Sequence, residues 1–544
     1  MEPANPEAVL LMNRLERLAT YRKTWESHWQ EIADYVIPRK ADITMSRTPG
    51  DKRMENVFDG TAIHAAELLS ASIHGMLTNP STTWFDLRYL DDELNTDDES
   101  KEYLETVTDI MLQEFQRSNF GEQIHELYHD LVTFGTGVLF IDDAPPPANG
   151  GIRFNTRHIS ECYLSEDEYG RVDTIFRKFK LTVRAIVKQF GEENVGQKIR
   201  DKLKQDPYQD QEIVHVVMPR DDFDMEKVDA GNMAFASIYI EPEQKLILRE
   251  SGYRENPYCC PRWCKSSFEQ GYGRSVSMVA LPDTKMINTM SQTTIKAAQK
   301  QVDPALMVPD DGFILPIRTR PGGLNFYRSG SRDRIEPLSI GANAPLGLNI
   351  EEQRRSAIRS AYYVDQLLMG QPTPGETATS AMIRNEERMR LLGPVMGRLQ
   401  HELLQPMVER VFNLLVAQDA FPEPPVMVEE SGFSVEYVSP IAKAQRTGEA
   451  QGIMRLFELM SPLASVDPSV FDHLDMDGLV RHMIKVLSIP AKVTNGEFEV
   501  AARRDERQAQ EQQQQQMMEA QQTAQSLGAV APAIKALQQS PGNL

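Results

Sequence analysis

The pentapeptide HELYH, residues 125–129, matches the H-E-x-x-H pattern of zinc metalloproteases. On a helix, histidines at positions i and i+4 share one face, so His125 and His129 could bind one zinc ion while Glu126 acts as general base. Against this interpretation, no familiar downstream motif supplies a third ligand, and so short a pattern recurs by chance in long chains. A metalloprotease therefore stays one alternative, beside an ordinary helix that carries two histidines.

A second stretch that could do chemistry is GYGRS, residues 271–275, which opens a predicted helix. Helix N-termini that follow glycines can hold phosphates, because their backbone N–H groups are free. The stretch matches neither the P-loop nor the dinucleotide-binding fingerprint, however, and a tight turn at Gly271 and Gly273 explains the glycines as well. Nucleotide binding at this turn is the second enzymatic alternative.

Three of the four cysteines, Cys259, Cys260 and Cys264, lie in the hexapeptide CCPRWC. Their spacing suits neither a disulfide framework nor a zinc knuckle. We expect reduced, partly buried thiols and folding in the cytoplasm. Because no nucleophile elbow, kinase signature or paired Cys/His motif is present either, the sequence predicts no catalytic residue, no metal ligand and no cofactor.

Composition limits the class of protein that could position such residues. With 544 residues, the chain should form several domains or an elongated molecule. It has no run of 18 apolar residues, and its N-terminus lacks the pattern of a signal peptide, so we expect neither a membrane span nor secretion. The net charge of −21 repels free nucleic acid, although local basic patches can still touch DNA.

Hydrophobic periodicity predicts an α+β protein. Helical spacing runs through most of residues 1–120, whereas residues 150–265 alternate apolar and polar positions as half-exposed antiparallel strands do. A further helix is predicted from about 274 to 302, with a bend near Pro282. Between Asp283 and Asp303 this helix has no acidic residue, and one of its faces should carry Lys285, Asn288, Gln292, Lys296 and Lys300.

Residues 303–345 favour a small β-like insert rich in proline and glycine. Against the single acid Asp333, its central part holds Arg318, Arg320, Arg328, Arg332 and Arg334. A second helix is predicted over 350–369, N-capped by Asn349 with Glu352 completing a capping box. Because each of the two helices would be about 30 Å long, the pattern predicts a hairpin-like stalk with a head.

The segment after the second helix is unusual for a joint between helices. Its residues are Gly370, Gln371, Pro372, Thr373, Pro374, Gly375, Glu376 and Thr377. The glycines give it conformational freedom, the prolines limit its collapse, and it has no Lys or Arg. A long helix is predicted over about 378–417, with an apolar residue at every fourth position and bends at Pro394 and Pro406. A strand within 433–440, helices over 441–489 and a low-complexity, Gln-rich tail complete the chain.

Two long stretches resemble the portal, or head-to-tail connector, proteins of short-tailed bacteriophages. They are GYGRSVSMVALPDTKMINTM at 271–290 and YYVDQLLMGQPTPGETATSAMIRNEERMRLLGPVMGRLQHELLQPMVERVFNLL at 362–415. The shorter stretch LVTFGTGVLFI at 131–141 is similar to that family too, and the order of segments fits it over roughly the whole chain. Neither HELYH nor the Gln-rich tail belongs to the resemblance.

The resemblance implies a portal fold in which each subunit of a dodecameric ring contributes a wing, a two-helix stem, a clip and a crown. It assigns 1–270 to the wing, helical at first and then β-rich. The stem helices would be 271–302 and 346–369, the clip 303–345, and a tunnel loop in the channel 370–377. The remaining segments would be a long wing helix and strand over 378–440, a helical crown over 441–500 and the tail over 501–544.

The resemblance also implies a function. The ring would occupy one capsid vertex of the virion, and double-stranded DNA would be packaged and later ejected through its channel without sequence specificity. Implied partners are the major capsid and scaffolding proteins, a tail adaptor and the terminase large subunit, which would hydrolyse ATP. The chain itself would be made in the host cytoplasm, would bind no membrane and would not be an enzyme.

The basic residues give this implied channel a mechanism. We hypothesise that Lys285, Lys296 and Lys300 face the channel or a neighbouring subunit, where they could contact phosphates transiently. The five arginines of the insert would meet the tail adaptor or the packaging motor, because such contacts are patterned by charge. The alternatives are a metal- or nucleotide-dependent DNA-processing enzyme and an interaction scaffold without a channel.

Overall fold

The computed structural model of the chain describes residues 5–48, 50–80, 82–90, 97–144, 151–224, 229–307, 336–337, 344–368, 392–425, 433–437, 452–460, 478–480, 483, 500, 502–510 and 512–514. They fall into two compact units. The first comprises Met1–Phe85, Ile110–Phe421 and Tyr437–Ile441, and the second Asp86–Asp109, Pro422–Glu436 and Ala442–Leu544. Helices and antiparallel strands alternate in the first unit, so the predicted α+β class is confirmed.

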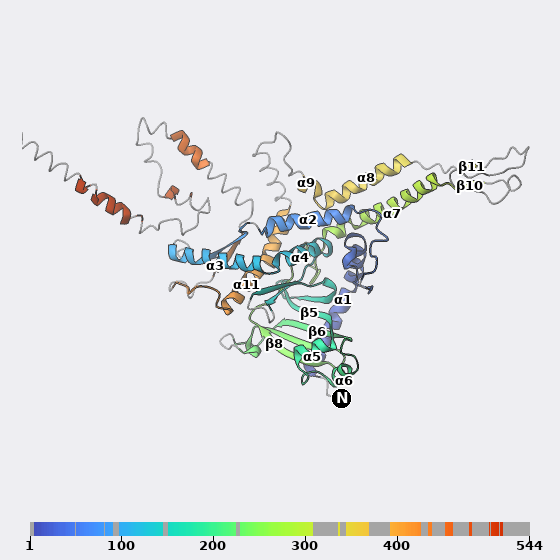
Figure 1. Ribbon diagram of the computed structural model, residues 1–544, viewed down its shortest axis with the longest axis horizontal. Coiled ribbons are helices and arrows are strands. Elements are labelled where there is room, and N and C mark those ends of the chain that lie inside the picture. The colour runs from blue at the N-terminus through green and yellow to red at the C-terminus, as the bar shows by residue number, and fades with distance from the viewer. Residues whose placement is uncertain are drawn as a thin grey trace, which may run out of the picture. The chain divides into compact units, whose positions relative to one another are not determined.

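A five-stranded antiparallel sheet forms the β-rich part of the first unit (Figure 1). In spatial order its strands are β4 (Cys162–Glu166), β5 (Val172–Thr182), β6 (Asp210–Pro219), β7 (Phe235–Glu241) and β8 (Leu246–Tyr253). The predicted strands over 150–265 are confirmed. Apolar clusters lie on both faces, so the sheet is more buried than the half-exposed sheet that the sequence predicts.

The helices on the two faces are amphipathic, which explains why they pack there. On one face α1 (Pro6–Val36) places Ala8, Leu11 and Leu15 against apolar side chains of β5, β6 and β7. On the other face α5 (Val183–Phe190) and α6 (Gln197–Gln205) bury their apolar residues against β6 and β8. Successive side chains of a strand point to opposite faces of the sheet, so they pack into two separate hydrophobic cores.

The first unit also contains a smaller, three-stranded sheet. Its order is β3 (Ile152–Thr156), β2 (Leu139–Asp143) and β9 (Tyr258–Cys259). The helices nearby are α2 (Thr61–Leu77) and α4 (Phe120–Phe134), which ends at the left-handed Gly135 with φ of 82°. Trp84, Phe115, Phe120 and Phe154 form an aromatic cluster here, with ring centroids of successive pairs 4.7–5.4 Å apart.

Shorter elements complete the described chain. The 3-10 helices are η1 (Pro38–Lys40), η2 (Ile159–Glu161) and η3 (Ala230–Asn232). Strand β1 (Phe85–Tyr89) pairs with β12 (Phe433–Tyr437), and α3 (Asp98–Arg117) follows β1 in sequence. The acidic run between β1 and α3 lies in part outside the described residues. No described helix has both the length and the apolar character that a membrane span requires.

The predicted pair of helices is present as an arm of the first unit. Helix α7 (Val276–Val302) lies beside α8 (Ala344–Ala361), and both extend away from the sheets in Figure 1. Strands β10 (Leu306–Met307) and β11 (Glu336–Pro337) pair antiparallel beyond the end of α7, so the chain that leaves α7 returns to α8 there. The helix predicted over 274–302 is therefore confirmed, and it continues through Pro282.

The expected limits of the second helix of the arm are wrong. Helix α8 begins at Ala344, so Asn349 lies inside the helix and is not its N-cap. Pro345 suits the first turn, because a proline there loses no helical hydrogen bond. The helix also ends at Ala361 instead of 369, because Tyr363 adopts a left-handed φ of 59° before the short α9 (Val364–Leu368).

The long helix predicted over 378–417 is described from Leu392 onward. It is helical to Leu399, π-helical over η4 (Gln400–Leu404) and α-helical again over α11 (Gln405–Ala417). The π-turn ends two residues before Pro406, whose missing N–H removes one bond of the helical ladder. The bends expected at Pro394 and Pro406 stay predictions. The apolar stripe is confirmed, because Leu399, Leu403, Met407, Val411 and Leu415 are buried.

Candidate functional site

The HELYH stretch lies in the middle of α4, where Tyr128 OH lies 3.3 Å from Thr78 Oγ1 and Glu126 is ion-paired. His129 is only 2% exposed, and burial lowers its pKa to about 3. The Glu126 carboxylate lies 2.8 Å from Lys40 Nζ, and the same ammonium lies 2.6 Å from Asp130 Oδ1. Within the part of the chain that the structure describes, no three His, Cys, Asp or Glu side chains are grouped to hold a metal ion. Glu126 is thus engaged in an ion pair rather than free to act as a base.

The GYGRS stretch is a close-packed turn. Gly271 has a φ of 78°, and a Cβ on Gly273 would lie 2.6 Å from the carbonyl oxygen of Gly135. Between them Tyr272 is buried, with its ring centroid 5.1 Å from that of Trp29. Ser275 Oγ accepts a hydrogen bond from Met278 N at 3.0 Å, so the N-terminus of α7 is capped by its own chain. These contacts support the interpretation of the glycines as a tight turn.

The four cysteines are free thiols, as the sequence predicts. Cys162, Cys259 and Cys260 are buried, and only Cys264 is exposed. Burial raises the pKa of Cys162 and of Cys259 to about 12, so both thiols stay protonated at neutral pH. They serve as small apolar side chains in the sheet rather than as nucleophiles.

The predicted lysine face of α7 divides into two parts. Asn288 is 8% exposed and holds the loop that precedes α2. Its Nδ2 donates to Asn56 O at 2.8 Å, and its Oδ1 accepts from Phe58 N at 2.7 Å. Lys285 Nζ lies 3.2 Å from Glu31 Oε2 on α1. Lys296 and Lys300 are exposed on the outer half of the helix, and the paired Lys285 is still 45% exposed. The predicted face is thus buried at Asn288 and exposed at its lysines.

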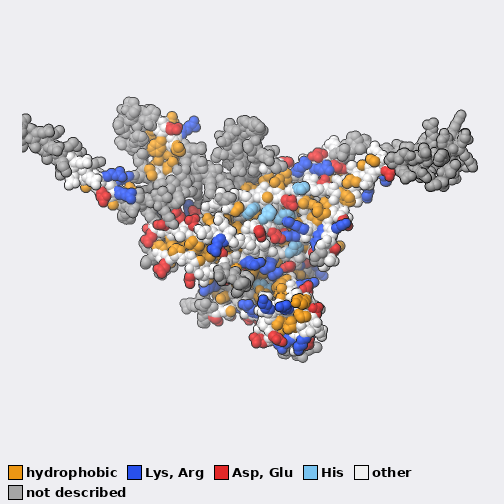
Figure 2. All heavy atoms as spheres, in the orientation of Figure 1, with side chains coloured by type: hydrophobic (Ala, Val, Ile, Leu, Met, Phe, Trp, Pro, Cys, Tyr) orange, Lys and Arg blue, Asp and Glu red, His pale blue; other side chains and the backbone are white. Residues whose placement is uncertain are grey.

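Exposed apolar side chains accompany these lysines on the arm. Val279 is 73% exposed, Met286 49% and Val302 87%. Figure 2 shows hydrophobic side chains along the part of the arm that carries α7 and α8, with few acidic ones. An uncovered helix that is apolar and lysine-bearing suits contact with another chain, because a helix of an isolated subunit would normally turn a polar face to water.

Ion pairs that could not be predicted from the sequence hold α8 in place. Arg354 Nη1 lies 2.9 Å from Asp283 Oδ1 on α7, and Arg355 Nε lies 3.0 Å from Asp59 Oδ2. Glu351, 3% exposed, accepts a hydrogen bond from Thr294 Oγ1 at 2.6 Å. Burial by itself would raise the pKa of Asp59, but hydrogen bonds from Thr61 and the guanidinium of Arg355 outweigh it and lower that pKa.

The inner end of the arm is fixed by a chain of hydrogen bonds. Tyr362 OH donates to Ser277 Oγ at 2.7 Å, and Ser277 Oγ donates to Val132 O at 2.9 Å. Both side chains are fully buried, so the end of α8, the start of α7 and α4 are tied together. No local pattern could have indicated this contact, because Tyr362, Ser277 and Val132 are far apart in sequence.

Two buried guanidinium groups attach the long helix to the sheets. Arg262 binds Glu402 of the π-turn bidentately, with Nη2 to Oε1 at 2.7 Å and Nε to Oε2 at 3.1 Å. It also contacts the carboxylate of Glu166 and donates to Gly170 O at 2.9 Å. About two turns further along, in α11, Arg410 Nη1 lies 2.9 Å from Glu255 Oε1. Two ion pairs with buried guanidinium groups thus connect the long helix to Arg262 and Glu255, and Arg262 is paired in turn with Glu166.

The remaining predicted site residues lie outside the described part of the chain. They are the tunnel-loop residues Gly370, Gln371, Pro372, Thr373, Pro374, Gly375, Glu376 and Thr377 and the clip residues Arg318, Arg320, Arg328, Arg332 and Arg334. Their roles stay predictions. The structure describes residues nearby: the clip arginines lie in sequence between β10 and β11, and the loop follows α9.

Comparison with known proteins bears on the whole chain. A family model described as bacteriophage head to tail connecting protein matches residues 8–494. A probable portal protein of Bordetella phage BPP-1 is 31% identical over 509 residues, which cover 92% of this chain and 91% of the relative. A portal protein of Salmonella phage epsilon15 is 29% identical over 517 residues, which cover 93% and 92%. The resemblance predicted from the sequence is confirmed, and the chain belongs to the family of bacteriophage head to tail connecting proteins.

Proposed function

We propose that this chain is the subunit of a portal ring, through whose channel double-stranded DNA enters the capsid during packaging and leaves it during ejection. The observation that carries the proposal is the similarity to portal proteins of two phages over more than nine-tenths of each chain. A ring of identical subunits needs surfaces that are complete only in the assembly. The arm of α7 and α8, with its exposed apolar residues and lysines, supplies such a surface.

The parts of the ring follow the segments of the chain. The arm is the stem, with residues 271–302 and 346–369, and the clip is 303–345 between them. Residues 1–270 and 378–440 form the wing, 370–377 the tunnel loop, 441–500 the crown and 501–544 a C-terminal tail. The side-by-side packing of α7 and α8 and the pairing of β10 with β11 beyond them support the stem and clip assignments.

DNA movement through such a ring depends on weak contacts. Twelve copies would carry a formal charge of about −250, so most of the ring surface repels DNA. Lys296 and Lys300, and Lys285 if its pair with Glu31 opens, would then offer sparse phosphate contacts without reading sequence. The duplex can slide, because few contacts must break at each step.

The proposed partners divide between the two ends of the ring. The clip arginines Arg318, Arg320, Arg328, Arg332 and Arg334 meet the terminase large subunit during packaging and the tail adaptor afterwards. The major capsid and scaffolding proteins surround the wing at one vertex of the virion, after synthesis in the host cytoplasm. ATP hydrolysis belongs to the terminase, and Glu126 and the GYGRS turn have structural roles that leave the enzymatic alternatives without support.

Assembly of the purified full-length chain tests this function. Negative-stain electron microscopy, with the mass measured in solution, should show rings with a central hole that a duplex of about 20 Å diameter can pass. Bound zinc or ATP hydrolysis by the isolated chain would instead favour the enzyme. A compact single particle without a hole under every assembly condition would overturn the proposal.

A further inference from the structure

The free edge of the five-stranded sheet is the starting point. β8 is the last strand in the order β4-β5-β6-β7-β8, and no other strand in the described ranges pairs with its outer side. Its second half is covered by the η3 turn: Arg220 Nη2 donates to Ser251 O at 3.3 Å, and Gly252 fits closely against Ala230 O. The first half, Leu246 to Arg249, borders an open groove instead.

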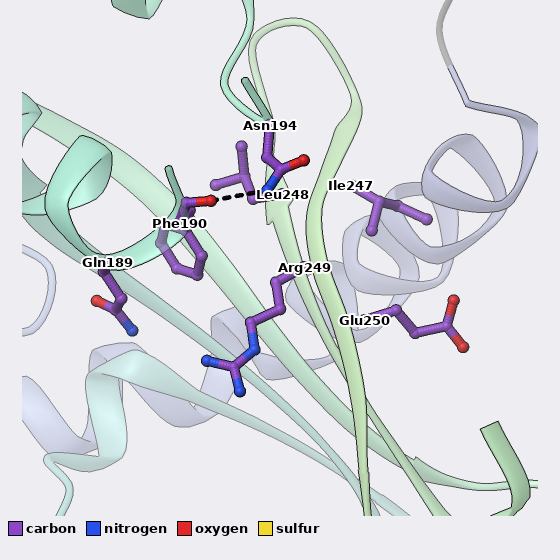
Figure 3. Close-up of a pocket in the computed structure, with 7 residues that line it drawn as sticks. All are labelled: Gln189, Phe190, Asn194, Ile247, Leu248, Arg249 and Glu250. Atoms are coloured by element: carbon purple, nitrogen blue, oxygen red, sulfur yellow. Dashed lines mark hydrogen bonds between the residues drawn. The ribbon is translucent and has the colours of Figure 1, made fainter. Parts of the chain in front are cut away.

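This groove lies between the first half of β8 and the end of α5 (Figure 3). Its volume is about 600 Å³. Phe190 and Leu248, both members of the core beneath, form an apolar floor, and the amides of Gln189 and Asn194 lie at its side. Asn194 Nδ2 donates to Phe190 O at 2.8 Å, which fixes the loop that follows α5.

A β-bulge presents one cation to the groove. The register shifts between Tyr239 and Ile240, so Tyr239 pairs with Arg249 and Ile240 with Ile247, and Leu248 is the extra residue. A bulge of this kind redirects the neighbouring side chains. The guanidinium of Arg249 is exposed and, among the described residues, has no ion-pair partner, because the adjacent Glu250 pairs with Arg220 at 2.8 Å. Figure 3 shows the Arg249 side chain on the same side of β8 as Phe190.

The helices beside the groove carry more basic than acidic residues, although the chain as a whole is acidic. Residues 183–205, which hold α5 and α6, have six Lys and Arg against three Asp and Glu. On α5, Arg184 and Lys188 are exposed and lie one turn apart. In Figure 2 the lobe that holds α5 and α6 shows Lys and Arg side chains, together with some Asp and Glu. This modest excess of positive charge favours an acidic partner.

We propose that the groove beside β8 binds an extended acidic segment of another protein, which adds a strand to the sheet. Backbone pairing along Leu246–Arg249 would supply affinity, and a carboxylate on Arg249 would supply selectivity. The sheet edge and the single cation among the described residues that line the groove favour a peptide over a nucleic acid, whose phosphates need a row of cations. Arg249 would also repel a basic strand, and together with the bulge it disfavours pairing of β8 with β8 of a second copy.

A peptide-binding experiment on the assembled full-length protein tests the proposal. The probe is a fluorescein-labelled hexapeptide that alternates aspartate and valine, and the counter-probe alternates lysine and valine. Fluorescence anisotropy should show binding of the acidic peptide alone. Arg249→Glu should weaken that binding at least tenfold and make the lysine peptide bind, because the charge of the site is reversed.

Matched controls separate a built groove from general attraction. Lys52→Glu makes a matching charge reversal at an 85% exposed side chain that does not line the groove, and it should alter the affinity less than twofold. An acidic peptide with N-methylated backbone amides keeps its charges but cannot pair with a strand, so it should fail to bind. Equal loss in both variants, binding of the N-methylated peptide, no binding at millimolar peptide, or Arg249-dependent binding of duplex DNA in place of peptide would each overturn the proposal. Unchanged melting of both variants confirms that they fold.

Discussion

At the scale of the residue, buried charges do more than the motifs to define this molecule. Arg262 is 2% exposed and depends on Glu402 and Glu166, which come from the long helix and from β4. A guanidinium that loses one partner in the interior keeps most of its desolvation cost, so the free energy of unfolding falls steeply. The pair therefore ties the position of the long helix to the stability of the sheets.

We expect Glu402→Gln to lower the free energy of unfolding by about 2–4 kcal/mol, because it removes the charge that faces Arg262 bidentately. Urea denaturation followed by circular dichroism measures the loss. The control is Glu31→Gln, whose carboxylate pairs with Lys285 at a 54% exposed site and should cost no more than about 1 kcal/mol. A loss as small in Glu402→Gln as in the control would contradict the role given to Arg262.

Histidine burial gives a second residue-scale prediction, about pH. His215 is buried between Tyr239, on which it stacks at 4.1 Å, and Ser237 Oγ at 2.9 Å from Nε2. Burial lowers its pKa to about 3, whereas an unfolded histidine titrates near pH 6.5. Between these values the unfolded state binds more protons, so this residue stabilises the fold above pH 6.5 and loses that contribution as the pH falls toward 3.

His215→Phe keeps the stacked ring but cannot be protonated. The variant should be less stable than the native chain at pH 7, because Ser237 loses a partner, yet its stability should fall less on acidification. The difference between the two slopes should approach about 1.4 kcal/mol per pH unit between pH 3 and 6.5. Urea midpoints across that range measure it. Parallel curves for both proteins would show that His215 is already accessible to protons in the fold.

At the scale of the element, periodicity predicted well and boundaries did not. The apolar stripe from Leu399 to Leu415 and the strands of the large sheet follow directly from spacing, and both are present. The end of α8 could not be predicted, because the left-handed Tyr363 follows a buried Tyr362 whose partner Ser277 lies on another helix. HELYH misleads for the same reason: Lys40, which engages Glu126, is distant in sequence.

The GYGRS turn gives the prediction that belongs to this scale. Gly273→Ala should lower the free energy of unfolding by several kcal/mol, about 3 or more, because the new Cβ would meet Gly135 O at 2.6 Å and Cys264 O at 2.9 Å. These atoms belong to packed backbone and cannot move away cheaply. Gly121→Ala in α4 has open space around it and should be neutral or gain up to about 1 kcal/mol. Thermal unfolding of the two variants compares them; equal stability would restore the view of a loose, ligand-binding loop.

At the scale of the whole molecule, the question is what the arm of α7 and α8 contacts in the assembly. The fold leaves Lys296 and Lys300 exposed while it pairs Lys285 with Glu31. We propose that the exposed lysines contact either a DNA phosphate in the channel or a neighbouring copy, and one subunit holds neither. A charge-reversal variant distinguishes these two contacts, because assembly of the ring and packaging of DNA can be measured separately.

Lys296→Glu should therefore reduce packaged DNA, measured as the length protected from nuclease in filled capsids, and the state of the ring shows why. Intact rings by electron microscopy with poor packaging would place Lys296 at the DNA, and this defect should ease with added salt because repulsion is screened. Loss of rings would place it between subunits. Lys296→Arg keeps the charge and should package normally, and Lys23→Glu, the same reversal on the exposed side of α1, should leave both readouts unchanged. Normal rings and full packaging in Lys296→Glu would remove this residue from the mechanism.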